Sequence, residues 1–271
     1  MQKSRHRDAV YKLIDNFVRE AKAELDHRWT SWKLDYSQIE VHEVVGALLA
    51  RQVTLASALA TNPGFWNGHL ASLVLRPMIE VYLNLSWILA VPLERARMFI
   101  LHGLGQMKLR VEHEKVVLQN ADDAGKQDAR EFIESMEQWI DSQQYGFLTT
   151  VNLGNWAELN QRKMADEIGL LDFYNRHYTP YSAGIHSMWH HVAIHNLKRC
   201  TNPLHRFHKV PEVPRLDADA HLALVAGKYL DMTFALFDDK LGLKSKAPSA
   251  FQNLCAGIER LTESKGRKSN S

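Results

Sequence analysis

The chain has 271 residues, 45% of them hydrophobic, which is enough apolar material for one sizeable buried core. Its 33 lysine and arginine residues and 31 acidic residues leave a formal net charge of +2, so we do not expect a duplex-DNA binder, which is usually more basic. The two cysteines, Cys200 and Cys255, lie far apart without a CxxC motif, which argues against a disulfide framework and a zinc ribbon and favours the cytoplasm.

Charged and apolar residues alternate at helical spacing near the N-terminus, which predicts an amphipathic helix rather than a secretory signal. The only candidate membrane span in the sequence is the apolar segment 69–91, but Arg76, Glu80 and Asn84 lie inside it and Pro77 interrupts it. An ionised side chain at the bilayer centre costs about 2.5–3.5 kcal/mol. We therefore expect a buried core helix in this segment and no membrane partner.

Apolar residues recur at i, i+3 and i+4 through most of the chain, which predicts helices almost everywhere, whereas strand signals are scarce. Segment 147–155 is expected to be a loop, and the proline-rich segment 200–217 an irregular connection. A short amphipathic helix is expected near the C-terminus. The other predicted helices cover, in chain order, residues 5–26, 39–60, 69–91, 92–120, 128–145, 155–169, 170–178, 179–197 and 218–241.

The sequence shows no repeat at a fixed period and no change of composition that would mark a domain boundary. We therefore predict an all-α protein, a single-domain helical bundle of about seven to nine helices over residues 1–255, with its core at 40–240. Residues 256–271 are expected to hold the end of a short helix and a polar tail. The sequence leaves open whether the bundle forms a homo-oligomer.

Arg76 and Glu80 stand four residues apart within segment 69–91, so they project from the same face of the expected helix. A buried charge without a partner costs several kcal/mol. The pair must therefore satisfy itself or meet polar groups from another helix. It is either a structural ion pair or one half of a functional site.

A second polar cluster is predicted in segment 177–195, which holds five of the 14 histidines. Tyr178, Tyr181, Ser182 and His186 supply phenols, a hydroxyl and an imidazole there, with the serine and His186 four residues apart on one expected helix face. A serine hydrolase is not favoured, because the chain has no GxSxG elbow. We expect this cluster to meet the charged pair of segment 69–91.

Histidines at HxxxH spacing can present two imidazoles to one metal ion, and two such pairs occur, His186/His190 and His191/His195. The HSMWHH string also resembles one histidine box of the membrane di-iron hydroxylases, but the further boxes and the membrane spans of those enzymes are missing. A metal-dependent hydrolase that uses Glu80 with His186 and His190 is therefore kept as an alternative. The sequence itself assigns no cofactor.

Three strings together resemble an uncharacterised bacterial family of all-helical proteins, known only as a domain of unknown function, over about residues 40–240. They are RPMIEVYLNLSWIL, YTPYSAGIH and CTNPLHRFH. A further analogy is to the helical HEPN superfamily, found in phage-defence and toxin settings, whose RNA-cleaving branch has an arginine four to six residues before a histidine, as at Arg97 and His102. The family resemblance implies a shared polar pocket formed by Arg76, Glu80, Tyr178, Tyr181, Ser182 and His186.

Two classes of function remain. In the first, an enzyme uses Glu80 or His186 as a general base while Arg76 binds an anionic group, with RNA or a nucleotide as the preferred ligand. In the second, the cluster only sets the helix register of a non-catalytic sensor or scaffold. A site open to solvent favours the enzyme, and a sealed ion pair favours the scaffold.

Overall fold

The computed structural model describes residues 2–120, 122–143, 156–157, 159–243 and 248–269. Most of this part of the chain is helical, with one pair of three-residue strands, so the predicted all-α class is confirmed. Residues 171–185 form a continuous helical segment. If this segment is counted as one helix, the described residues hold ten α-helices, more than the seven to nine expected. The loop expected at 147–155 lies outside the described residues.

Seven long helices form most of the structure, joined by shorter elements. The long helices are α1 (Gln2–Ser31), α2 (Ile39–Thr61), α3 (Ser72–Ile88), α4 (Pro92–Asn120), α5 (Asp123–Asp141), α10 (His221–Leu241) and α11 (Ala250–Ser269). The shorter ones are the 3-10 turns η1 (Tyr36–Gln38) and η2 (Pro63–Phe65), α6 (Gln161–Glu167), α7 (Leu171–Phe173), the π-helical turn η4 (Tyr174–Tyr178), α8 (Thr179–Ile185), α9 (Trp189–His195), β1 (Leu197–Arg199) and β2 (Lys209–Pro211).

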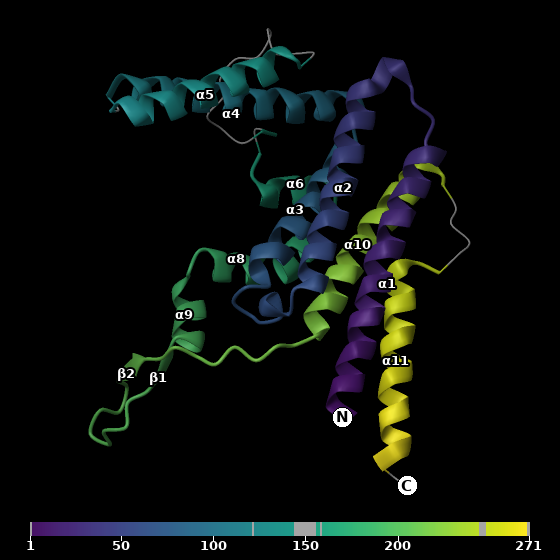
Figure 1. Ribbon diagram of the computed structural model, residues 1–271, viewed down its shortest axis with the longest axis vertical. Coiled ribbons are helices and arrows are strands. Elements are labelled where there is room, and N and C mark those ends of the chain that lie inside the picture. Colours follow the sequence, from purple (N-terminus) through teal and green to yellow (C-terminus); the bar gives the residue numbers. More distant parts are fainter. Residues whose placement is uncertain (1, 121, 144–155, 158, 244–247, 270–271) are drawn as a thin grey trace.

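The apolar helix α2 lies in the middle of the bundle and packs against α1, α3, α4 and α10, while α11 lies along α1 (Figure 1). The core contains one fully buried amide, Gln52 of α2. Its side-chain nitrogen donates to the carbonyl oxygens of Met78 and Tyr229, both at 3.2 Å, and to the Thr233 hydroxyl at 2.9 Å. This amide therefore joins α2, α3 and α10 at one point.

The helices α4 and α5 form an antiparallel arm that projects from one end of the bundle (Figure 1). A separate small apolar cluster around Val111, Ile133 and Ile140 holds the two helices together. At the other end of the molecule, α9 and the β1–β2 hairpin project from the bundle on the same side as the arm.

The single helix expected over 179–197 is wrong, because the chain turns between α8 and α9. Ser187 adopts a left-handed conformation with φ of 48°, and the Met188 amide donates to the Ala183 carbonyl at 3.0 Å. This is a Schellman motif, which usually has glycine at the left-handed position. Because a serine stands there, the residue pattern contains no signal for the helix end.

Two further expectations need correction. The connection expected at 200–217 contains β2, which pairs antiparallel with β1 in the register Lys198↔Val210. The C-terminal helix is longer than predicted, since α11 continues to Ser269 and the residues expected to form a tail are helical up to that point.

One segment of the described residues, Tyr36–Thr61, is long and apolar enough to cross a membrane by length and composition alone. It is a different segment from 69–91, the candidate that the sequence suggested. In the structure, 56% of its most apolar window is buried by the rest of the chain. A core helix meets the same test, so this segment is weak support for a membrane span.

Gly184 lets α8 approach the start of α3 closely. A Cβ atom at this position would lie 2.9 Å from Ser72 Oγ and 3.3 Å from the His191 ring. Ser72 is almost fully buried, and its hydroxyl already donates to the His69 carbonyl at 2.8 Å, so it cannot move away without losing that bond. The packing of α8 on α3 therefore requires a residue without a side chain.

We predict that Gly184→Ala destabilises the protein by about 1–3 kcal/mol, because the new methyl group overpacks the α3–α8 contact. The control is Gly103→Ala on α4, where the added Cβ meets nothing within 4 Å. That change should instead stabilise the fold by about 0.5–1 kcal/mol through helix propensity. Urea denaturation of both variants measures the difference, and equal effects would contradict the close approach.

Candidate functional site

One side of α3 carries polar side chains at helical spacing, Arg76, Glu80 and Asn84, and it faces the segment 161–178. The Asn84 amide oxygen accepts a 2.9 Å bond from Gln161 of α6. One turn further, the Trp87 indole donates to the Glu167 carboxylate. The polar side chains of α3 thus form a row of contacts with segment 161–178. We call this row the polar seam.

The predicted partners Arg76, Glu80 and Tyr178 meet at the start of this seam. Arg76 Nη2 donates to the Tyr178 hydroxyl at 2.7 Å and lies 3.2 Å from Glu80 Oε1. The Tyr178 hydroxyl donates to the same carboxylate oxygen at 2.9 Å. The Arg76 side chain is 19% exposed and that of Glu80 is 32% exposed, so the cluster is neither sealed in the core nor fully in solvent.

Burial, together with the adjacent Glu80 carboxylate, raises the pKa of Tyr178 to about 12, against the opposing effect of the Arg76 guanidinium. The phenol therefore stays protonated at neutral pH. In this state it can donate one hydrogen bond to Glu80 and accept one from Arg76, but it cannot act as a base. Glu80 is the carboxylate of the cluster.

In the π-helical turn η4, the adjacent residues His177 and Tyr178 contact different helices, α10 and α3. Tyr178 points to α3 and stacks on Tyr174, with ring centroids 4.6 Å apart, while His177 Nδ1 lies 3.0 Å from the Tyr229 hydroxyl of α10. Tyr181 also forms a side-chain hydrogen bond with Tyr229. Turns of this kind are frequent at functional sites.

Burial governs the titration of this second group. It raises the pKa values of Tyr181 and Tyr229, so both phenols stay neutral. It lowers the pKa of His177, and the positive charges of Lys228 and Arg176 lower it further. The segment 174–181 is therefore held between α3 and α10 by neutral phenols and a neutral imidazole.

Two of the predicted site residues do not join the cluster. Ser182 is half-buried and His186 is exposed, and within the described residues neither side chain makes a hydrogen bond or ion pair. The turn at Ser187 also takes His186 and His190 off a common helix. Within the described residues, Glu80, His186 and His190 do not form a set of converging metal ligands.

The other HxxxH pair does come together with a third histidine. His191 and His195 of α9 lie with ring centroids 4.5 Å apart, and His69 lies 5.3 Å and 4.9 Å from them. Burial and the neighbouring imidazoles lower the pKa of His191. The rings meet at steep angles, which is typical of aromatic packing between α9 and the chain before α3.

The arginine and histidine of the HEPN-like string occupy separate surroundings on α4. Arg97 forms an ion pair with Glu40 of α2 at 2.9 Å, and Glu40 is only 3% exposed. His102 has a buried Nδ1 without a hydrogen-bond partner in the described structure. The observed role of Arg97 is therefore to compensate a buried carboxylate.

Sequence reasoning missed Tyr229 as a member of the polar network. It lies in the apolar helix α10, where an aromatic residue at helical spacing indicates ordinary core, and it is indeed 3% exposed. Only its hydroxyl distinguishes it from its neighbours. A buried phenol needs a hydrogen-bond partner, and this need was the one available signal.

We predict that Tyr178→Phe destabilises the protein by about 1–2 kcal/mol at pH 7, because it removes two hydrogen bonds to charged groups. The folded-state pKa of Tyr178, about 12, lies above the unfolded value of about 10. Its contribution is therefore present below pH 10 and is lost as the pH rises towards 12. The free energy of unfolding, measured by denaturation at each pH across this range, should fall less steeply for the variant than for the wild type.

Tyr11→Phe, at an exposed tyrosine of α1, serves as the control and should keep the wild-type profile. The difference in tyrosinate absorbance between the wild type and Tyr178→Phe during alkaline titration isolates this phenol from Tyr181 and Tyr229, whose pKa values are also raised. Identical alkaline profiles for the wild type and Tyr178→Phe would show that this hydroxyl is not held between Arg76 and Glu80.

Comparison with known proteins gives one match. The model of a family described as "Family of unknown function (DUF5677)" matches residues 42–202. No curated protein and no solved structure matches the chain. The matched span contains all six predicted site residues and confirms the expected family of unknown function, over a shorter range than the 40–240 suggested by the motifs. Because the match covers more than half of the 271 residues, the chain belongs to the DUF5677 family.

Proposed function

We propose that the cluster of Arg76, Glu80 and Tyr178 binds a phosphate-bearing ligand, with RNA or a nucleotide as the ligand class. The observation that carries this proposal is the incomplete use of the Arg76 guanidinium. Nη2 serves both Tyr178 and Glu80, whereas the buried Nε has no hydrogen-bond partner within the described structure.

A guanidinium has five N–H donors in a fixed planar arrangement that suits bidentate binding of phosphate. An ion pair with only a structural role would be expected to use all of its buried N–H donors, because a buried donor without an acceptor costs about 1–3 kcal/mol. A buried group of this kind calls for an explanation, although Gln52, Ser57 and Gln161 also hold such atoms in the described structure. A ligand would meet the terminal nitrogens of the Arg76 side chain, which is 19% exposed, and would reach the buried Nε only if the side chain moved.

Two further cations lie on the α10 side of segment 161–178, beside His177. Arg176 and Lys228 are exposed and lie close enough to His177 to lower its pKa. The protonated Tyr178 can turn its hydroxyl towards a ligand oxygen. If a chemical step follows binding, Glu80 is the group of this cluster that would serve as general base.

A second candidate function is a helical scaffold in which the seam only sets the register of segment 161–178 on α3. The observation that favours it is that Asn84 and Trp87, further along the seam, have purely structural partners.

The proposed location is the cytoplasm. The support is chemical, because both cysteines are free thiols, as is usual in a reducing compartment.

We predict that Arg76→Lys keeps the protein folded, with a near-native melting temperature, while weakening ligand binding by about tenfold or more. Lysine keeps the charge near Glu80 but lacks the planar fork. Binding is measured with a labelled single-stranded oligouridine RNA, with AMP and with inorganic phosphate. Because both charges are partly exposed, Arg76→Ala should cost only about 1–3 kcal/mol of stability.

Arg51→Lys on the exposed face of α2 is the matched control and should change neither stability nor binding. A growth assay of the same variants in a bacterial host tests the defence or toxin setting. If the wild type binds none of the three probes, or if Arg76→Lys binds them as tightly as the wild type, the scaffold function is the correct one.

A further inference from the structure

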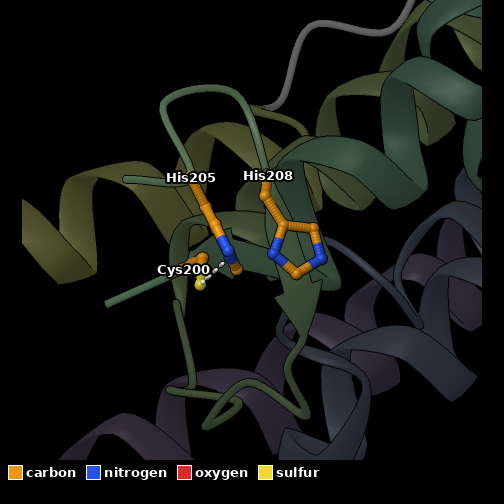
Figure 2. Close-up of side chains that lie close together, drawn as sticks. All are labelled: Cys200, His205 and His208. Carbon is orange, nitrogen blue, oxygen red and sulfur yellow. Dashed lines mark hydrogen bonds between the residues drawn. The ribbon is translucent and has the colours of Figure 1, made fainter. Parts of the chain in front are cut away.

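The β1–β2 hairpin brings together three side chains that are typical metal ligands. Cys200 follows β1, and His205 and His208 precede β2. One ligand atom from each residue lies within 4.8 Å of the others (Figure 2). The Cys200 Sγ atom is 3.7 Å from His205 Nδ1, and the rings of His205 and His208 have centroids 5.4 Å apart.

Backbone hydrogen bonds fix the loop that carries these residues. The Cys200 amide donates to the His208 carbonyl at 3.1 Å, which closes the loop at its base. Inside it, the His205 amide donates to the Asn202 carbonyl at 3.0 Å and the His208 amide to the His205 carbonyl at 3.2 Å. These two successive turns place both imidazoles on the side of the loop where the thiol lies (Figure 2).

The Asn202 side chain contacts both the backbone of this loop and the His205 ring. Its oxygen accepts a 3.0 Å bond from the Leu204 amide, and its amide nitrogen lies 3.2 Å from His205 Nε2. The outer edge of the His205 ring is therefore held by the loop itself, which leaves Nδ1 directed at the thiol. In this contact the Asn202 amide donates to Nε2. When a metal ion takes Nδ1, Nε2 carries the ring proton, so the Asn202 amide must turn away and leave this N–H to water.

The observed separations suit a tetrahedral zinc ion. With Zn–S of about 2.3 Å and Zn–N of about 2.0–2.1 Å, tetrahedral ligand atoms lie about 3.3–3.6 Å from one another. The distance of 3.7 Å between Cys200 Sγ and His205 Nδ1 is close to this range. His208 needs to approach by about 1 Å, which rotation of an exposed imidazole allows.

We propose that Cys200, His205 and His208 bind one Zn²⁺ ion, with a water molecule in the fourth position. One thiolate and two imidazoles are a ligand set that suits zinc, and three protein ligands with one open position are the usual arrangement where zinc keeps a water molecule. Coordination replaces the S–H bond of Cys200 with an S–Zn bond and releases one proton to solvent.

The position of the hairpin in the fold gives a physical reason for such an ion. The strands have three residues each, and a hairpin of this size is marginally stable on its own. It projects from the bundle (Figure 1), and the tip residues Leu204 and Phe207 are each 88% exposed, so no apolar core holds the loop. A metal ion supplies the missing stabilisation in small structures of this kind.

This site is independent of the proposed phosphate site on α3. The family match ends at residue 202, so it contains Cys200 but neither histidine ligand. The three ligands follow the spacing C-x4-H-x2-H, which differs from the CxxC and HxxxH spacings that indicate a metal site in a sequence. This spacing brings its ligands together only because a hairpin closes at Cys200 and His208.

The test is titration of the full-length, chelator-treated protein with Zn²⁺ and with Co²⁺. We expect one ion per chain, a thiolate-to-cobalt charge-transfer band and intense visible bands of tetrahedral cobalt. Cys200→Ser, His205→Ala and His208→Ala should each weaken zinc binding by at least about 100-fold, since they remove direct ligands. Their helical circular dichroism should stay unchanged, because the hairpin lies outside the core.

Three controls separate this site from other thiols and imidazoles. Cys255→Ser on α11 and His113→Ala on α4 should bind zinc as the wild type does. His191→Ala tests the competing cluster of His69, His191 and His195. The proposal is overturned if the wild type binds no zinc, if the cobalt complex lacks the thiolate band, or if binding survives Cys200→Ser and is lost in His191→Ala.

Discussion

The burial of α3 on almost every side is the constraint on which the rest of the structure depends. The helix contacts α2, α4 and α10 of the bundle and α6, η4 and α8 of the segment that crosses it. An apolar helix can satisfy the bundle side, but Arg76 and Glu80 must then find partners on the crossing side. The position of segment 161–185 is therefore set by polar groups together with its buried apolar residues, among them Met164, Ala165 and Ala183. Tyr178, Gln161 and Glu167 lie where the α3 side chains require them.

The same constraint bears on the binding role proposed for the cluster. Along the seam, the Asn84 to Gln161 bond uses the Gln161 amide nitrogen, while Gln161 Oε1 is buried without a partner in the described structure. Arg76 keeps a buried Nε without a partner in the described structure, although Tyr178 and Glu80 are in reach of its terminal nitrogen. The seam holds the guanidinium in place, and its unused donors are what an anion would complete. Under the proposed function, positioning and binding would be two uses of the same contact.

The pairing of Arg76 and Glu80 with Tyr178 could be predicted from the sequence. The rule that buried charges need partners requires only the residue types and their spacing. The sequence was insufficient for His186, since the helix that should have carried this histidine to the site ends in a Schellman turn with serine at the left-handed position. The hairpin was missed because three-residue strands are too short to show alternation. Tyr229 was missed because its hydroxyl lies in an otherwise apolar helix pattern.

The two sites differ in what holds them. At α3, the apolar core fixes the backbone, and the polar cluster is a consequence of burial. In the hairpin, nothing apolar supports the loop, so its geometry rests on backbone and Asn202 hydrogen bonds in partial contact with water. Such bonds contribute little against solvent competition. A convergence of one thiol and two imidazoles at that place is costly in conformational entropy unless something binds them. Metal coordination is the interaction strong enough, at this size, to offset that cost.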